Sequence, residues 1–208
     1  MFNEKFGLET AVLNGTKTMT RRMVNVPEYW HGMWVWGFAF DKQSHSLRLY
    51  DADEGSMEDP DTGECAYIKP RYNVGEVVAV AQSYKSIFEE SLNYALPRYH
   101  WLDDHIDEKG YTNKMFVKAS EMPHQIRITD IKVERLQDIS DEDCLREGVL
   151  ERVIRPFKTL ETKYQAPKTP IYKDTPREAF AALIDKVSGK GTWKRNPWVW
   201  VYSFEKIK

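Results

Sequence analysis

The sequence predicts an α+β protein in which a curled, partly closed β-barrel is flanked by a few helices. Segments typical of strands outnumber those typical of helices, and irregular intervals separate them. The apolar alternation of residues 125–136 also changes phase at Thr129 and Asp130, as in a strand with a β-bulge. Because bulges bend strands into barrels, this pattern favours a barrel over an alternating parallel α/β sheet.

The composition fits a single domain over residues 1–208. Of the 208 residues, 41% are hydrophobic, which supplies enough apolar surface for a sizeable core. Charged residues make up 30% of the chain but nearly cancel at a net charge of −2, so any basic binding site must be local. An aromatic and acidic insertion is expected at about residues 27–70.

The chain is expected to be cytoplasmic, with no membrane partner. No window approaches the roughly 18 apolar residues that a membrane span needs, and the N-terminus lacks a basic start followed by an apolar core. Cys65 and Cys144 stand far apart without metal-ligand spacing, so both are expected to be reduced thiols.

The first half of the chain predicts a short helix followed by extended segments. The helix covers Phe6 to Leu13 and ends at Asn14 and Gly15, a pair that readily forms a left-handed cap. The aromatic residues 29–40 and the segment 44–51 predict a hairpin, and the acidic residues 51–64 predict a solvated loop.

The middle of the chain is less regular. Residues 77–80 predict a buried strand that ends at Gln82 and Ser83, and residues 115–119 predict another short strand. Residues 85–114 show no clean period and are interpreted as irregular structure.

The C-terminal third has the clearest local signals. Ser140 is placed to cap a helix that Gly148 closes, and Thr175 is placed to cap a longer helix with Pro176 at its first position and an apolar stripe. The alternating aromatic and aliphatic residues 198–204 predict a strand that is buried on both faces.

The segment "LNGTKTMTRR", from Leu13 to Arg22, is the main candidate binding motif. Gly15 frees the backbone, while Lys17, Arg21 and Arg22 supply charge suited to phosphate. The threonine hydroxyls add neutral donors. A solvated basic loop after a helix is the structural alternative, because cations also favour the C-terminal end of a helix dipole.

Four blocks together resemble the ASCH domain, a branch of the PUA-like superfamily, and in particular the ASCH proteins often carried by phages and prophages. These blocks are "GTKTMTRR", "VGEVVAVAQSY", "MPHQIRITDIKVERLQDISDEDCLREGV" and "WKRNPWVWVYSFEKI", and they spread from about residue 6 to residue 207. The resemblance implies a small β-barrel flanked by helices, with a cleft lined by a GxKxxExR motif. Here the motif is Gly15, Lys17, Thr20 and Arg22, with Thr20 where the general pattern often has an acid.

The resemblance implies binding of RNA or of a modified nucleoside, and two enzymatic alternatives. One branch removes the acetyl group from N4-acetylcytidine by using a lysine, a threonine three residues later and a glutamate at the end of a following strand. Ribonuclease activity has been proposed elsewhere in the superfamily. Lys17 and Thr20 match the first two positions of the amidohydrolase constellation, whereas Gln82 occupies the position where an acid is expected.

The presence of glutamine instead of an acid at position 82 affects whether the protein can hydrolyse an amide. A threonine hydroxyl needs a nearby base to take its proton, and a lysine serves as that base only when its environment holds it neutral. Gln82 can hydrogen-bond a substrate amide but cannot accept a proton as a carboxylate does. Glu76, Glu89 and Glu121 are candidate substitutes for the acid.

Further residues are expected on the binding surface or in the core. Tyr84 and Trp101 are candidates to stack on an unpaired base, whereas Trp198 and Trp200 are expected to fill the core. Lys194 and Arg195 either widen a basic rim or form a charged turn. His124 and Arg127 open a strand and are interpreted as surface residues.

The sequence therefore favours a nucleotide-binding protein in which Lys17 and Arg22 hold phosphate, Thr20 and Gln82 read the base, and Arg21 assists from the rim. The alternatives are an amidohydrolase acting through Lys17, Thr20 and Gln82, and a protein-interaction module built on the aromatic hairpin. No metal cluster, Walker loop or dinucleotide fingerprint is present, so no metal or cofactor is expected. The sequence leaves the oligomeric state open.

Overall fold

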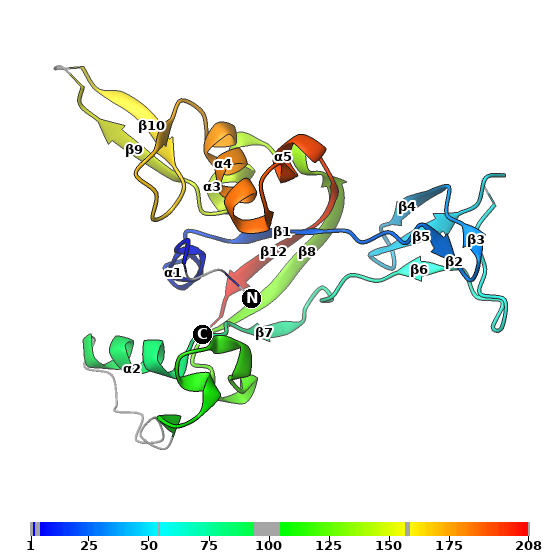
Figure 1. The fold of residues 1–208 in the computed structure, drawn as a ribbon, viewed down its shortest axis with the longest axis horizontal. Coiled ribbons are helices and arrows are strands. Elements are labelled where there is room, and N and C mark those ends of the chain that lie inside the picture. The colour runs from blue at the N-terminus through cyan, green and yellow to red at the C-terminus, as the bar shows by residue number, and fades with distance from the viewer. Residues whose placement is uncertain (1, 3–4, 54, 94–104, 157–158, 208) are drawn as a thin grey trace.

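The computed structural model describes residues 2, 5–53, 55–93, 105–156 and 159–207. These residues form a mixed α+β structure with twelve strands and five α-helices (Figure 1). The α-helices are α1 (Leu8–Leu13), α2 (Tyr84–Asn93), α3 (Asp141–Arg146), α4 (Pro176–Ser188) and α5 (Thr192–Arg195). The 3-10 helices are η2 (Lys109–Tyr111), η3 (Lys114–Phe116), η4 (Ala119–Glu121) and η5 (Leu136–Asp138).

The strands divide among four antiparallel sheets. They are β1 (Met19–Met23), β2 (Tyr29–Trp30), β3 (Met33–Trp34), β4 (Gly37–Asp41), β5 (Ser46–Tyr50), β6 (Tyr67–Ile68), β7 (Val77–Ala79), β8 (Gln125–Arg135), β9 (Leu150–Ile154), β10 (Glu161–Gln165), β11 (Tyr172–Lys173) and β12 (Trp198–Lys206).

The largest sheet has the strand order β1-β12-β8-β7 and curls into a half-barrel. The partner of β12 shifts from Asp130 to Ile128 between Ser203 and Phe204, which leaves Thr129 as the extra residue of a bulge. The bulge and the partly closed barrel predicted from the sequence are therefore confirmed.

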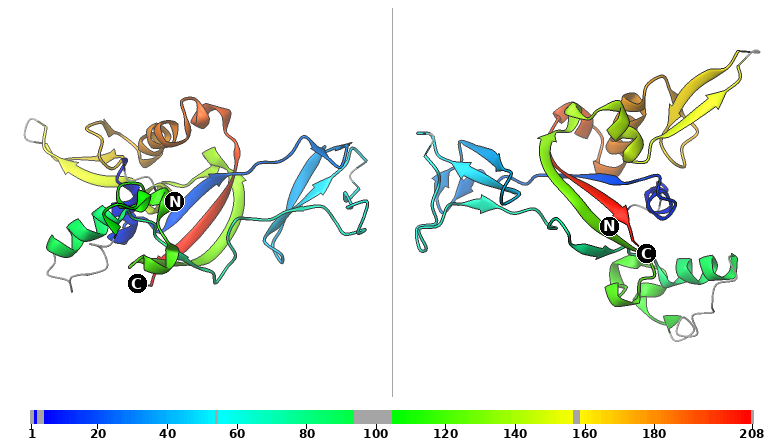
Figure 2. Two further views of the ribbon diagram at one scale, coloured as in Figure 1. Left: turned by 60° about the horizontal axis from the view of Figure 1, so that its bottom comes forward. Right: turned by 180° about the vertical axis from the view of Figure 1, so that it is seen from behind.

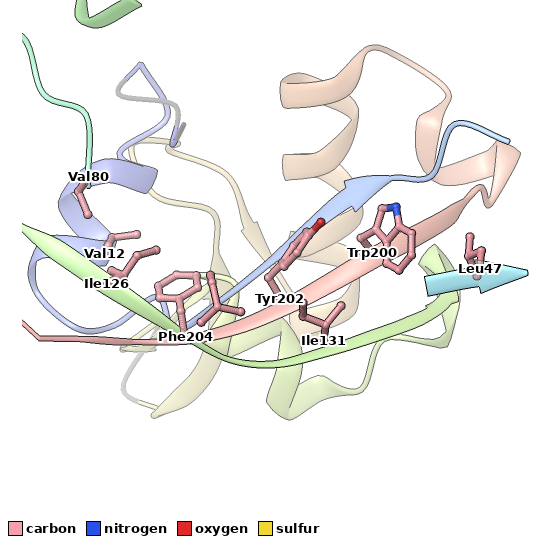
Figure 3. Packing of buried hydrophobic residues seen from close by; sticks show 9 residues of the cluster. Val12, Leu47, Val80, Ile126, Ile131, Trp200, Tyr202 and Phe204 are labelled. Carbon is pink, nitrogen blue, oxygen red and sulfur yellow. The ribbon is translucent and has the colours of Figure 1, made fainter. Parts of the chain in front are cut away.

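One face of this sheet forms the main hydrophobic core. Val12 of α1 packs there with Ile126, Ile131, Tyr202 and Phe204 from the two long central strands (Figure 3). Trp200 is also buried in this cluster, as the alternation of β12 predicted. The core therefore lies between the curled sheet and the first helix.

Helices α3 and α4 cover the opposite face of the sheet. The N-terminus of α3 is capped by Ser140, whose hydroxyl accepts a hydrogen bond from the Asp143 amide. Thr175 caps α4 in the same way through the Glu178 amide. Both helix starts predicted from the sequence are confirmed, and so is the end of α1 at Asn14 and Gly15.

Residues 24–70, called the lobe below, project from the half-barrel as a separate β structure (Figure 2). It contains the sheets β2-β3 and β4-β5-β6. Phe38 packs edge-on against Trp198 with ring centroids 5.3 Å apart, and Phe40 does so against Trp200 at 6.3 Å. These contacts fix the base of the lobe on β12, and the predicted hairpin is the β4–β5 pair.

Two local predictions for the middle of the chain are wrong, and a third is confirmed only in part. Residues 84–93 are helical rather than irregular. Tyr84 and Ile87 form a short apolar face that packs with Met122, and the Ser83 hydroxyl caps the helix by accepting a hydrogen bond from the Ser86 amide. Residues 115–119 form 3-10 turns rather than a strand. The predicted strand at residues 77–80 is present as β7, but it is an edge strand, so Val77 is about half exposed and only Val80 is fully buried.

Candidate functional site

Two adjoining cavities form a cleft at β1. The first, of about 500 Å³, lies between α1, β1 and α4 and is lined by Lys17, Thr20 and Glu147; we call it the polar cavity. The second, of about 310 Å³, lies against the core face of the sheet and is lined by Ile126 and Tyr202; we call it the apolar cavity. Both cavities share a wall formed by Phe2, Thr20, Arg22, Lys114 and Met115.

The alternation of β1 divides the predicted motif between the two faces of the sheet. Thr20 and Arg22 pair with Tyr202 and Trp200, whose side chains lie in the core face. Opposite residues of an antiparallel pair project to the same face, so Thr20 and Arg22 point toward the cleft. Arg21 pairs with Val201 on the face that α3 and α4 cover.

Lys17 and Arg21 belong to a buried network of charges. The Lys17 ammonium lies 2.5 Å from Glu147 Oε2 and also donates to the Glu147 carbonyl oxygen. Arg21 contacts Glu134 at 2.6 Å, Asp143 at 2.9 Å and Glu147 at 3.2 Å. Only 2% of Lys17 and 5% of Arg21 is exposed. Because a buried charge needs compensation, the acids of the same chain that contact these two side chains balance their charge.

The pKa values of this network are shifted by burial and pairing. Removal from water lowers the pKa of Lys17 below its ordinary value, and Glu147 offsets this only in part. Burial alone would lower the pKa of Arg21, but Glu147 and Glu134 raise it. Burial would raise the pKa of Asp143, yet the contact with Arg21 holds it below its ordinary value.

The prediction that Arg21 lies on the rim of the binding site is therefore wrong, because its side chain is buried among acids. Of the predicted motif, Thr20 is half-buried and lines both cavities, and Arg22 is exposed and lines both. Gly15 is exposed with a φ of 73°, and a β-carbon there would meet open space. The left-handed backbone at Gly15 ends α1 and starts the turn into the motif.

Gln82 and Tyr84 lie outside the cleft. The Gln82 side chain is buried and donates to Glu90 Oε2 at 3.1 Å, and it lines neither cavity. Tyr84 is fully buried and donates to Glu121 Oε2 at 2.6 Å, so its ring packs inside the protein instead of stacking on a ligand. Trp101, the other predicted stacking residue, lies outside the described residues.

The remaining predicted residues, Lys194, Arg195, His124 and Arg127, line neither cavity. Lys194 and Arg195 are exposed on α5 and line neither of them, which fits the charged-turn interpretation. Arg127 is exposed and pairs with Glu205 at 3.1 Å, and His124 contacts Glu90 at 3.3 Å.

None of the three candidate acids lines either cavity. Glu76 accepts a hydrogen bond from the Asn73 amide, Glu89 is exposed beside Lys85, and Glu121 accepts from Tyr84. The carboxylate that lies beside Lys17 is instead Glu147, which the sequence reasoning missed.

Glu147 could have been found by its place in the helix. It is the C-cap residue of α3, where the helix dipole disfavours a negative charge. An acid at this position, just before Gly148, is stabilised by a neighbouring cation, and this is the signal that the sequence contained. Lys114 and Arg71, which line the apolar cavity, carried no such signal in the sequence.

The described residues contain no group of three or more His, Cys, Asp or Glu side chains arranged to hold a metal ion. In the same part of the chain, no helix combines the length and the apolarity that crossing a membrane requires.

No protein-family model matches the sequence, and no significant match to it is found among curated proteins or solved structures.

Proposed function

We propose that the chain is a PUA-like protein of the ASCH type that binds one nucleotide of an RNA strand in the cleft at β1. The observation that carries this proposal is the junction of an apolar cavity with cations on its wall. A nucleotide joins an apolar base to an anionic phosphate, and the cleft offers a partner for each part.

The apolar cavity supplies surface for the base. Ile126, Ile128 and Phe204 line it together with Tyr202, and Tyr72 packs edge-on against the Tyr202 ring at 5.7 Å. Contact of a base with such apolar and aromatic surface is tolerant of sequence, because every base has an apolar face.

The cations supply the phosphate site. Arg22 and Arg71 are exposed and line the apolar cavity, and Arg22 also borders the polar cavity. Their planar guanidinium groups fit phosphate oxygens in a bidentate geometry. The phosphate role expected of Lys17 therefore passes to Arg22 and Arg71, because the charge of Lys17 is already paired with Glu147.

A titration of a short fluorescein-labelled single-stranded RNA at several salt concentrations tests this proposal. Loss of a charge-assisted hydrogen bond costs about 1.5–3 kcal/mol, so Arg22→Ala should weaken binding by roughly tenfold to a hundredfold and reduce the salt dependence. Lys194→Ala removes an exposed cation that lines neither cavity and is the matched control. Equal affinity of Arg22→Ala and wild type, or an equal loss in the control, would contradict the proposal.

A second function, hydrolysis of an amide such as N4-acetylcytidine, is favoured by one specific observation. Lys17, Thr20 and Glu147 line the same polar cavity, and Lys17 contacts Glu147. Thus a carboxylate is present beside the lysine even though Gln82 lies elsewhere. The lowered pKa of Lys17 increases the fraction of neutral amine that can act as a base.

In this reaction the Thr20 hydroxyl oxygen attacks the amide carbonyl carbon while Lys17 takes the hydroxyl proton. The carbon–nitrogen bond then breaks, and Lys17 returns the proton to the departing cytidine amine. Water attacks the acyl-threonine ester, which releases acetate and restores the hydroxyl. Glu147 orients the Lys17 ammonium during both transfers.

Hydrolysis of N4-acetylcytidine by the purified protein tests this second function. Thr20→Ala should lower turnover by at least about 100-fold while nucleoside binding measured by calorimetry persists. Thr162→Ala removes an exposed threonine of β10 and should leave turnover unchanged. Absence of turnover in the wild type would exclude this function.

A further inference from the structure

The lobe differs from the rest of the chain in charge. Residues 24–70 contain nine acidic and three basic residues, a formal charge of −6, whereas the rest of the chain carries +4 of the total of −2. Seven of these acids fall between residues 51 and 64, a segment without lysine or arginine, which we call the acidic loop. The near-neutral net charge of the chain is therefore the sum of an acidic lobe and a basic remainder.

The lobe also exposes large aromatic side chains. β2 and β3 form a hairpin whose turn residues, His31 and Gly32, have φ values of 47° and 82°, the sign that a tight two-residue hairpin turn requires. Tyr29 lies directly opposite Trp34 in this hairpin. Tyr29, Trp34 and Trp36 are 58%, 51% and 54% exposed, and we call them the aromatic face.

The core of the lobe does not use the aromatic face. Leu49, Met57 and Ala66 form that core, and the half-buried Trp30 and Val35 pack against it. Trp34 and Trp36 flank Val35 with a spacing of two residues, which places their side chains on one side of an extended segment and Val35 on the other. Folding of the lobe therefore leaves this large apolar surface in water, which is characteristic of a binding site.

The acidic loop borders the aromatic face at both ends. At one end, the Asp59 carboxylate lies 3.4 Å from the His31 ring nitrogen at the hairpin turn. At the other end, the Trp36 amide donates to the Tyr50 carbonyl oxygen at 3.0 Å, and the acidic loop begins with the next residue, Asp51. The two surfaces therefore adjoin.

The acids of this loop have no lysine or arginine partner among the described residues. Asp51 and Asp59 accept hydrogen bonds from backbone amides of the loop itself, which fixes the turns and leaves the negative charge uncompensated. Asp53, Asp61 and Glu64 are exposed. Their field attracts a cation and repels a phosphate backbone.

We propose that the aromatic face and the acidic loop together bind a lysine- or arginine-rich segment of a partner protein. Guanidinium and ammonium groups bind the faces of tryptophan and tyrosine by cation–π contacts, and the aliphatic stems of these side chains cover apolar surface. The carboxylates of the loop neutralise the remaining charge of the segment. This site is separate from the cleft and takes a ligand of the opposite charge.

A fluorescein-labelled peptide of three Arg-Gly-Gly repeats is the first probe, with three Glu-Gly-Gly repeats as the matched peptide. The arginine peptide should bind the wild type and the glutamate peptide should not. The double variant Trp34→Ala/Trp36→Ala should weaken binding at least tenfold, whereas Tyr172→Ala, which removes an exposed aromatic side chain of β11, should leave it unchanged. Circular dichroism establishes that each variant is folded.

A second variant tests the charge independently of the aromatic face. Asp61→Lys/Glu64→Lys should weaken binding and lower its salt dependence, because each substitution replaces attraction by repulsion. Arginine-peptide affinity that is unchanged in both variants would overturn the proposal, and so would failure of the peptide to bind the wild type. Loss of RNA binding in Trp34→Ala/Trp36→Ala, or loss of self-association measured by sedimentation, would overturn it in favour of an RNA or a second copy as occupant.

Discussion

The half-barrel and the lobe use acidic residues in opposite ways. In the half-barrel, Glu134, Asp143 and Glu147 are withdrawn from solvent and surround Arg21, while Glu147 also contacts Lys17. In the lobe, Asp53, Asp61 and Glu64 of the acidic loop are exposed, and Asp51 and Asp59 accept hydrogen bonds from backbone amides of the loop rather than from lysine or arginine.

This difference separates acids that hold the fold together from acids that are available to a partner. Removing one member of a buried pair leaves a charge without compensation in a medium of low dielectric constant. An exposed acid is already solvated, so its removal changes the surface potential and leaves the packing intact. The same residue type therefore contributes to stability in one region and to recognition in the other.

The largest effect is expected for Glu147→Ala. This substitution leaves Lys17 buried without its carboxylate and removes one partner of Arg21, so the free energy of unfolding should fall by about 3–5 kcal/mol. Urea denaturation followed by tryptophan fluorescence measures the loss. Glu205→Ala removes an exposed ion pair with Arg127 and should change stability by less than about 1 kcal/mol. Equal effects of the two substitutions would contradict the distinction between buried and exposed acids.

A smaller, pH-dependent effect is expected for Asp143→Asn. The native pKa of Asp143 lies below its ordinary value of 3.8, so in acid the unfolded chain binds a proton more readily than the native protein does. The stability that the carboxylate contributes is present above the ordinary pKa and is lost as the pH falls through the native pKa. The difference in unfolding free energy between wild type and variant should therefore be largest above about pH 5 and shrink toward pH 2. A difference that stays constant with pH would contradict this account.

The smallest effect on stability is expected in the acidic loop. Asp61→Asn/Glu64→Gln removes two exposed charges that have no lysine or arginine partner among the described residues. The free energy of unfolding should change by less than about 0.5 kcal/mol, as measured by the same denaturation experiment. A loss comparable to that of Glu147→Ala would show that the acids of the loop are structural after all.

The parts of the fold that were predicted correctly depend on near neighbours in the chain. Ser140 and Thr175 bond to amides three residues away, and the bulge at Thr129 appears as a phase change in one segment. Helix α2 was missed because its apolar face is short and is stabilised by packing with Met122, which lies far along the chain.

The candidate site was predicted only in part. Thr20 and Arg22 line the cleft as expected, whereas Gln82 and Tyr84 are engaged inside the protein. Gln82 occupies the end of a predicted strand, where the resemblance implies an acid, but its position in the sequence contains no information on the direction of its side chain.

The sequence by itself determined the helix caps, the alternation of the strands and the grouping of cations behind Gly15, because these features depend on spacings of a few residues. Only the tertiary structure decided on which face of the sheet each of those cations lies. Arg21 and Arg22 are adjacent, but successive residues of a strand point to opposite faces of the sheet. Arg21 therefore contacts the buried acids, whereas Arg22 lines the cleft. Glu147 meets Lys17 across 130 residues of chain, a contact that forms only when α3 packs beside β1.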